Sequence, residues 1–253
     1  MRIAEIFRSF QGEGRLTGAE SVFVRASGCN LRCRYCDTPY ASWVPEGEDL
    51  SVDEIVARVE QLDRQPPPAR PPGAVQPAGR AATVHGGRVA HAVLTGGEPM
   101  LFAELVPLAA ELHRQGRHVT IETAGTLLLP VVCDLMSISP KLSNSTPAAA
   151  GDPRWTWRHE STRAAREVVR RLTADYDYQL KFVVADLADC REVEAYLAGL
   201  PGVDRSRAML MPQGTDAELL AEAGRWLEPY CRAHGLAFCP RRQIEWFGAG
   251  RST

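Results

Sequence analysis

The sequence lacks long apolar runs and an excess of charge of either sign. Its 253 residues carry a net charge of −2, so no global basic field would attract nucleic acid or an anionic lipid surface. The longest apolar stretches, such as residues 127–133, are too short to cross a bilayer. Arg2, Glu5 and Arg8 stand where a signal peptide would have its apolar core. We therefore expect a cytoplasmic protein that does not bind nucleic acid directly or enter a membrane.

The cysteines are too unevenly spaced for a disulfide framework. There are seven, an odd number, and in a reducing cytosol a tight group of thiols indicates metal or redox chemistry instead. Three of them, Cys29, Cys33 and Cys36, form such a group. The others are scattered, and we expect them to be small buried apolar residues: Cys133, Cys190, Cys231 and Cys239.

Short apolar runs alternate with helical patterns along the chain. The expected strands cover residues 21–25, 89–94, 118–121, 135–138, 180–184, 208–211 and 236–238. The expected helices cover residues 51–62, 102–115, 161–174, 187–198 and a segment that begins at Thr215. Capping boxes start two of these helices, Ser51 with Glu54 and Thr215 with Glu218. This rhythm predicts one α/β domain over residues 1–253, an abbreviated partial (βα) barrel with six or seven mostly parallel strands.

Two stretches interrupt the pattern. Residues 64–88 are rich in proline and glycine, which disfavours a packed element and predicts a mobile surface insertion. Residues 142–160 are rich in Ser, Asn, Pro and Ala, which is typical of either an active-site loop or a long connection.

The cysteine group has the spacing Cys-x3-Cys-x2-Cys and directly follows an expected strand. Three thiolates leave one coordination position open, whereas a structural zinc site normally closes it with a fourth Cys or His. No histidine precedes His85 in the sequence. An iron–sulfur cubane with one iron open to a small ligand therefore explains the residues better than zinc does.

These residues, with Tyr35 before the last cysteine, resemble the signature of the radical S-adenosylmethionine superfamily. The resemblance implies a 4Fe-4S cluster whose open iron binds S-adenosylmethionine. Cleavage of that cofactor then gives the 5′-deoxyadenosyl radical that abstracts hydrogen from a substrate. Gly96, Gly97 and Glu98 resemble the superfamily element that meets the methionyl ammonium. Met211 and Gln213 resemble its adenosyl-binding segment, although a strand-ending turn of this kind is common.

Further motifs narrow the resemblance to the family of 7-carboxy-7-deazaguanine synthases. They include Gln11-Gly12-Glu13-Gly14, Phe23-Val24-Arg25, Cys36-Asp37-Thr38, Glu122-Thr123, Ser139-Pro140-Lys141 and Leu180-Lys181-Phe182. The family converts 6-carboxy-5,6,7,8-tetrahydropterin to 7-carboxy-7-deazaguanine with loss of ammonia, a step in 7-deazapurine (queuosine) biosynthesis.

The family resemblance also implies roles for individual residues. Substrate contacts are expected from Gln11, Gly12, Glu13, Gly14, Arg25 and Thr95, and cofactor contacts from Tyr35, Glu122, Ser139 and Lys141. Thr38 would bind Mg²⁺. Each of these residues also has an interpretation without a site role. Gln11 and Glu13 would form a solvated turn, Arg25 would be a surface charge, and Thr38 would cap the turn before Pro39 through a local side-chain bond.

One family feature is missing. The family tends to carry a substrate-contacting His-Lys pair near its C-terminus, but the tail from Arg241 to Gly248 has no histidine. Either Glu245 or Arg242 replaces that contact, or the tail is rearranged. The resemblance further implies an electron donor such as flavodoxin and a homodimer.

Two alternative functions stay open. One is an activase for glycyl-radical enzymes. The other is a zinc-stapled RNA-binding module, which the acidic charge balance disfavours.

Overall fold

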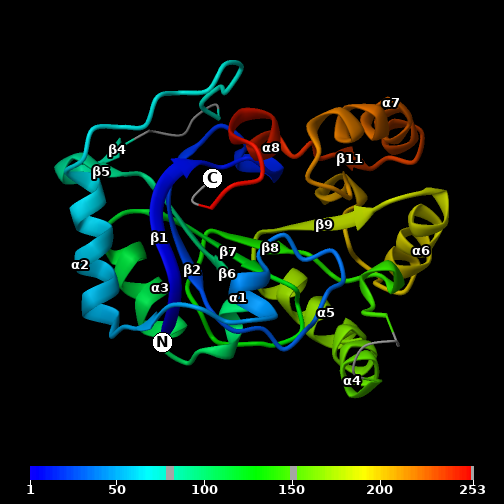
Figure 1. Ribbon diagram of the computed structural model, residues 1–253, viewed down its shortest axis with the longest axis horizontal. Coiled ribbons are helices and arrows are strands. Elements are labelled where there is room, and N and C mark those ends of the chain that lie inside the picture. Colours follow the sequence, from blue (N-terminus) through cyan, green and yellow to red (C-terminus); the bar gives the residue numbers. More distant parts are fainter. Residues whose placement is uncertain (78–82, 149–152, 252–253) are drawn as a thin grey trace.

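A computed structural model describes residues 1–77, 83–148 and 153–251 of the chain. Parts of the two interrupting stretches, residues 78–82 and 149–152, lie outside these described residues, so the predictions for them are not addressed there. One open sheet with strand order β11-β10-β9-β8-β7-β6-β2-β1-β3 organises the rest (Figure 1).

The parallel part of the sheet confirms the seven predicted strands. They are β2 (Glu20–Ala26), β6 (His91–Gly96), β7 (His118–Thr123), β8 (Leu135–Ile138), β9 (Tyr178–Val184), β10 (Ala208–Pro212) and β11 (Ala237–Phe238). Each strand pairs in parallel with the next one, and the two ends of the sheet do not meet. The expected partial barrel is therefore correct.

The sheet continues beyond β2 through strands that were not predicted. Strand β1 (Arg2–Phe10) runs antiparallel to β2, and β3 (Glu48–Asp49) runs antiparallel to β1. A register shift between Ile3 and Glu5 breaks the alternation of buried and exposed side chains in β1, which hides the strand pattern in the sequence. A separate hairpin joins β4 (Thr83–Val84) and β5 (Arg88–Val89) through the 3-10 turn η2 (His85–Gly87).

The helices follow the strands largely as predicted. They are α1 (Pro39–Ser42), α2 (Val52–Asp63), α3 (Leu105–Arg114), α4 (Pro153–Arg163), α5 (Arg166–Asp175), α6 (Leu187–Ala198), α7 (Ala217–Ala233) and α8 (Arg242–Phe247). Short 3-10 turns are η1 (Gly14–Leu16), η3 (Pro99–Leu101), η4 (Ser143–Ser145) and η5 (Arg205–Arg207). The capping box of Ser51 and Glu54 is present at the start of α2.

Two helix predictions were wrong in detail. Asp216 caps α7 by accepting hydrogen bonds from the backbone of Glu218 and Leu219, so Thr215 is not the cap. The single helix expected over residues 161–174 is two helices, because Ala165 leaves helical geometry between α4 and α5. Part of the 142–160 stretch therefore belongs to η4 and α4 instead of being one long loop.

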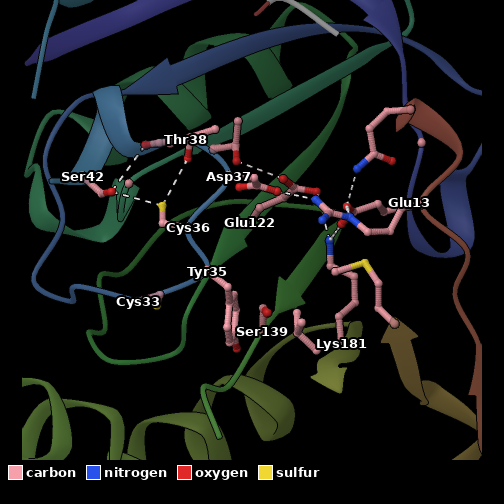
Figure 2. Close-up of a pocket in the computed structure, with 18 of the residues that line it drawn as sticks. Glu13, Cys33, Tyr35, Cys36, Asp37, Thr38, Ser42, Glu122, Ser139 and Lys181 are labelled. Carbon is pink, nitrogen blue, oxygen red and sulfur yellow. Dashed lines mark hydrogen bonds and ion pairs between the residues drawn. The ribbon is translucent and has the colours of Figure 1, made fainter. Parts of the chain in front are cut away.

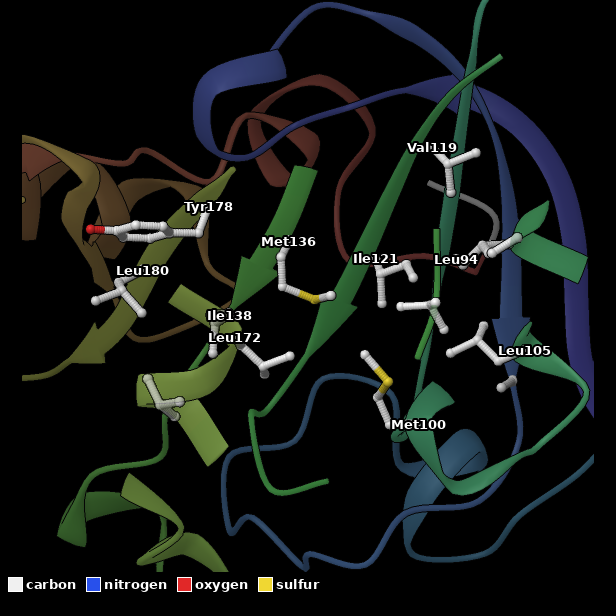
Figure 3. Packing of buried hydrophobic residues seen from close by; sticks show 14 of the residues in the cluster. Leu94, Met100, Leu105, Val119, Ile121, Met136, Ile138, Leu172, Tyr178 and Leu180 are labelled. Atoms are coloured by element: carbon white, nitrogen blue, oxygen red, sulfur yellow. The ribbon is translucent and has the colours of Figure 1, made fainter. Parts of the chain in front are cut away.

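The core lies between the parallel strands and the helices that cover their outer face. Leu94, Ile121 and Met136 of β6, β7 and β8 are buried in one cluster with Leu105 of α3 and Leu172 of α5 (Figure 3). This packing fixes the strands as a rigid frame and leaves their carboxyl ends free to carry a site. None of the helices in the described ranges is long and apolar enough to cross a membrane.

The described part of the proline-rich stretch contacts the main sheet. The Arg70 guanidinium lies 4.7 Å from the centre of the Phe10 ring and donates a 3.0 Å hydrogen bond to the Gly18 carbonyl. Ala74 is buried as well. The mobility of this insertion stays a prediction, but these residues of it pack behind the loop that carries Gln11 and Glu13.

Candidate active site

A cavity of about 500 Å³ opens at the carboxyl ends of the parallel strands. It collects residues that lie far apart in the sequence and come from β1, β2, β6, β7, β8, β9 and β10 (Figure 2). Of the predicted site residues it is lined by Gln11, Gly12, Glu13, Arg25, Cys29, Cys33, Tyr35, Cys36, Thr38, Thr95, Gly96, Gly97, Glu122, Ser139, Lys141, Met211 and Gln213. Gly14 and Glu98 do not line it.

The three thiols of the cysteine loop lie at one end of this cavity. Burial raises the pKa of Cys29 to about 12 and that of Cys33 to about 11, and the neighbouring thiols add to both shifts. In the described part of the chain no three His, Cys, Asp or Glu side chains surround a single metal position. Three thiolates that line one cavity, each able to bind a different iron, are the donor set of a cubane cluster with one iron left open.

Backbone contacts hold the cysteine loop against the Gly96-Gly97 turn. The Glu98 amide donates to the Gly28 carbonyl at 2.8 Å, and the Gly97 amide donates to the Ala26 carbonyl at 3.0 Å. A β-carbon on Gly97 would lie 2.3 Å from the Gly28 carbonyl oxygen, so only glycine allows this approach. The paired glycines therefore lock two cavity-lining loops together.

Glu98 has a different position from the one its motif implied. Its carboxylate is fully buried and accepts hydrogen bonds from Thr123 Oγ1 at 2.8 Å, from the Ala124 amide at 2.8 Å and from the Met100 amide at 3.0 Å. Burial is the largest influence on the pKa of Glu98 and raises it. This carboxylate ties the ends of β6 and β7 together, so the backbone of the motif, not the Glu98 side chain, faces the cavity.

A buried ion-pair cluster occupies the opposite end of the cavity. The Lys181 ammonium lies 2.8 Å from Glu13 Oε2 and 3.4 Å from Glu122 Oε1 (Figure 2). Burial by itself would raise the pKa of Glu13, but Lys181 and Arg241 lower it to about 2. Gln11 and Thr95 donate further hydrogen bonds to Glu122. Lys181 belongs to one of the motifs that carry the family resemblance, but no residue pattern predicts that its side chain enters the site.

Two predicted substrate residues already have protein partners. Arg25 Nε donates to Glu5 Oε1 at 2.6 Å, and Tyr40 donates to the same oxygen at 2.8 Å. Arg25 is thus neither a bare surface charge nor a fully free binding group. Gly14 has a φ of +73° and packs against the Gln179 side chain. This backbone conformation and close packing account for a glycine at position 14 without a contact to the substrate.

Thr38 and Tyr35 flank the last cysteine of the loop. Thr38 precedes α1, but its side chain makes no capping hydrogen bond, and its hydroxyl lies 3.8 Å from Cys36 Sγ. Thr38 is therefore not a side-chain cap of α1, and the local contact of its hydroxyl is with the Cys36 thiol. The Tyr35 hydroxyl donates to Asn144 Oδ1 at 3.3 Å, which fixes its ring beside the cavity.

The remaining predicted cofactor residues face the cavity from β8 and β10. The Lys141 ammonium lies 2.7 Å from Ser139 Oγ. Gln213 Oε1 is buried and has no hydrogen-bond partner in the part of the chain that the structure describes. An unpaired buried acceptor at a cavity wall fits a ligand that brings a hydroxyl or amine.

The C-terminal prediction was wrong by one residue. Arg242 and Glu245 pair with each other on the surface, while their neighbours Arg241 and Gln243 line the cavity. Arg241 donates to Asp37 of the cysteine loop and lies 3.5 Å from Glu13 Oε1. Arg241 therefore connects the two ends of the cavity. The helical turn of α8 decides which arginine faces inward, and residue type alone could not.

Comparison with known proteins agrees with this geometry. Residues 23–172 match the Radical SAM superfamily. The chain is 41% identical to a 7-carboxy-7-deazaguanine synthase of Rhodopirellula baltica over 99% of this chain and 88% of that protein. It is 38% identical to one from Halobacterium salinarum over 96% of this chain and 88% of that protein.

The solved structure of QueE from Escherichia coli has the same fold, with a TM-score of 0.66 and 22% identity over 95% of this chain and 93% of that one. The relatives do not support the glycyl-radical activase or the zinc-stapled module. The chain belongs to the radical S-adenosylmethionine superfamily and, within it, to the family of 7-carboxy-7-deazaguanine synthases.

Proposed function

We propose that this protein converts 6-carboxy-5,6,7,8-tetrahydropterin to 7-carboxy-7-deazaguanine with loss of ammonia, a step in 7-deazapurine biosynthesis. The observation that carries the proposal is one cavity with the three-cysteine loop at one end and the Lys181 ion-pair cluster at the other. The near full-length identity to two enzymes named for this product supports the same activity.

Cys29, Cys33 and Cys36 would hold the 4Fe-4S cluster, and S-adenosylmethionine would lie along the loops after β6, β7, β8 and β10. When bound, the cluster supplies the electron that cleaves this cofactor to the 5′-deoxyadenosyl radical. Close backbone packing at Gly97 exposes the Gly96–Gly97 turn to the methionyl part. The unpaired Oε1 of Gln213 suits a hydroxyl or amine of the adenosyl part.

The polar end of the cavity suits a carboxylated pterin. The terminal nitrogens of Arg25 have no hydrogen-bond partner among the described residues, and a guanidinium binds a carboxylate with both of them. Lys181 keeps the Glu13 carboxylate ionised and lies 3.4 Å from Glu122 Oε1, so the oxygens of both side chains can accept hydrogen bonds from the ring nitrogens of the pterin. The positive charge of Arg25 is therefore complementary to the substrate carboxylate, and the carboxylates of Glu13 and Glu122 are complementary to its ring N–H groups.

Thr38 would contribute one oxygen to a Mg²⁺ ion at the mouth of the cavity. Its hydroxyl makes no capping hydrogen bond, so the side chain is available to a ligand. Mg²⁺ commonly keeps waters and substrate oxygens around one or two protein oxygens. The ion would neutralise negative charge on the substrate during the rearrangement.

The enzyme needs a reductant, as a member of its superfamily, and acts on a small molecule, as a member of its family. We also propose flavodoxin as the donor, a homodimer as the assembly and the cytoplasm as the location. The clustered free thiols support a cytoplasmic location, because such thiols persist in a reducing compartment.

Anaerobic turnover of the reconstituted protein with the carboxytetrahydropterin tests the activity. We expect 7-carboxy-7-deazaguanine and ammonia in equal amounts by mass spectrometry and ammonia assay. Cleavage of S-adenosylmethionine without consumption of the pterin would show that the substrate is a different one.

A further inference from the structure

A basic and aromatic surface lies directly outside the cysteine loop. Its centre is Trp155 of α4, whose ring has the Arg32 guanidinium at 4.0 Å and the Arg158 guanidinium at 5.1 Å from its centre. Arg34 of the cysteine loop and Trp157 of α4 are exposed as well. We call these five residues the arginine–tryptophan patch.

The charges of this patch have no acidic partner among the described residues. Several other exposed arginines pair with a carboxylate, as Arg170 does with Glu167. Within residues 1–77, 83–148 and 153–251 no ion pair joins Arg32, Arg34 or Arg158 to an acidic side chain. The patch is therefore a locally positive surface on a chain whose net charge is −2.

A buried histidine fixes α4 to the cysteine loop. His159 Nδ1 accepts a hydrogen bond from the Arg32 amide at 3.1 Å, and its Nε2 lies 2.8 Å from Ser145 Oγ. The Ser145 carbonyl in turn accepts from the Arg34 amide at 2.9 Å. The patch is consequently rigid relative to the three cysteines.

Two hydrogen bonds connect this surface to the peptide groups of the cysteines. Arg32 Nη1 donates to the Cys29 carbonyl at 2.8 Å. On the other side of the loop, Trp43 Nε1 donates to the Cys33 carbonyl at 3.0 Å, and Trp43 is 40% exposed. A partner that covers Arg32 and Trp155 would therefore lie only one side chain away from the Cys29 peptide group.

We infer that the arginine–tryptophan patch is the docking surface for an acidic one-electron carrier protein. This inference rests on the proposed function, in which the carrier loses one electron, the cluster gains it, and no atom is transferred. Arginine and tryptophan are enriched at protein interfaces, and electron-transfer complexes are small and transient. The positive charges of the patch are complementary to an acidic protein, so they would favour the approach that brings the carrier to the cysteines.

The test uses reduced and oxidised flavodoxin as the probe. We expect the double variant Arg34→Glu/Arg158→Glu to raise the Kd for oxidised flavodoxin about tenfold or more at low salt. The rate of flavodoxin-dependent cleavage of S-adenosylmethionine should fall by a similar factor. The rate with dithionite should stay within about twofold, because a small reductant does not need the patch.

The matched control reverses two exposed arginines of α7, in the variant Arg225→Glu/Arg232→Glu. It has the same change in net charge and should leave the Kd nearly unchanged. Equal weakening by both variants, or no weakening by the patch variant, would overturn the inference. Wild-type protein gives a second measurement that needs no substitution: the Kd must rise with salt, and a salt-independent Kd would also overturn it.

These measurements separate this inference from the proposed function. Neither the binding of flavodoxin nor the cleavage of S-adenosylmethionine requires the pterin. A protein that binds flavodoxin through the patch but makes no deazaguanine would retain the docking surface and lose only the substrate assignment.

Discussion

The Lys181 ammonium lies 2.8 Å from Glu13 Oε2, although the two residues are 168 positions apart in the chain. Both are largely buried at the substrate end of the cavity. The pair holds the Gln11–Gly14 loop against β9, and its stability should depend on pH because Glu13 has a pKa of about 2 instead of the usual 4.5.

Replacing Glu13 by Gln should lower the free energy of unfolding at pH 7 by about 2 kcal/mol. Lys181 keeps Glu122 as a partner, so the loss should be smaller than for a fully broken buried pair. A carboxyl group with a lowered pKa stabilises the folded state above its unfolded pKa, and this contribution disappears as the pH falls through the folded pKa. The difference between wild type and Glu13→Gln should therefore shrink between pH 4.5 and 2.

Urea unfolding of both proteins across this pH range measures the difference. Glu245→Gln is the control, because Glu245 pairs with Arg242 on the surface and should cost less than about 0.5 kcal/mol. A difference that does not vary with pH would mean that Glu13 is not ionised in the way we describe.

Replacing Cys33 by Ala should abolish both the cluster and the cleavage of S-adenosylmethionine. Wild-type protein reconstituted without oxygen should contain about four irons, and two remaining thiolates are too few to hold them. The control is Cys133→Ala, which changes a partly buried cysteine outside the cavity. Full iron content and cleavage in Cys33→Ala would refute the cluster assignment.

Replacing Thr38 by Ala should slow turnover and raise the Mg²⁺ concentration needed for half-maximal rate. The hydroxyl makes no cap for α1, so its removal should not disturb folding or the binding of S-adenosylmethionine. Thr38→Ser keeps the hydroxyl and should retain most of the activity. Identical Mg²⁺ dependence in wild type and Thr38→Ala would leave Thr38 without a metal role.

Replacing Arg70 by Ala should raise the KM for the pterin about tenfold without changing the iron content. Arg70 contacts Phe10, which lines the cavity, and Gly18, whose amide is bonded to the Gln11 carbonyl at 2.8 Å. One cation–π contact and one hydrogen bond together stabilise this loop by about 1–2 kcal/mol.

Arg64→Ala is the control for Arg70→Ala, because Arg64 is exposed in the same stretch.

A deletion of most of residues 64–88 should keep the fold and the cluster, since the free energy of unfolding changes only logarithmically with loop length. Loss of iron on deletion would show that the cysteine loop also depends on this segment.

The sequence by itself determined the parallel sheet and the cluster loop. Apolar runs bounded by turn residues gave all seven parallel strands, because a strand buried on both faces needs little from its neighbours to be recognised. The three cysteines lie within one short loop, so their spacing alone brings them near one another. Strand β1 was missed because its register shift disrupts the local pattern.

Only the tertiary structure decided how the rest of the site is arranged. The direction of the Glu98 carboxylate depends on where Thr123 and Ala124 lie at the end of another strand. The inward position of Arg241, and not Arg242, depends on how α8 packs over the cavity. Lys181 lies between Glu13 and Glu122 only because β9 is brought near β7 and the end of β1. Such contacts join distant parts of the chain, and their geometry is set by packing and not by local residue patterns.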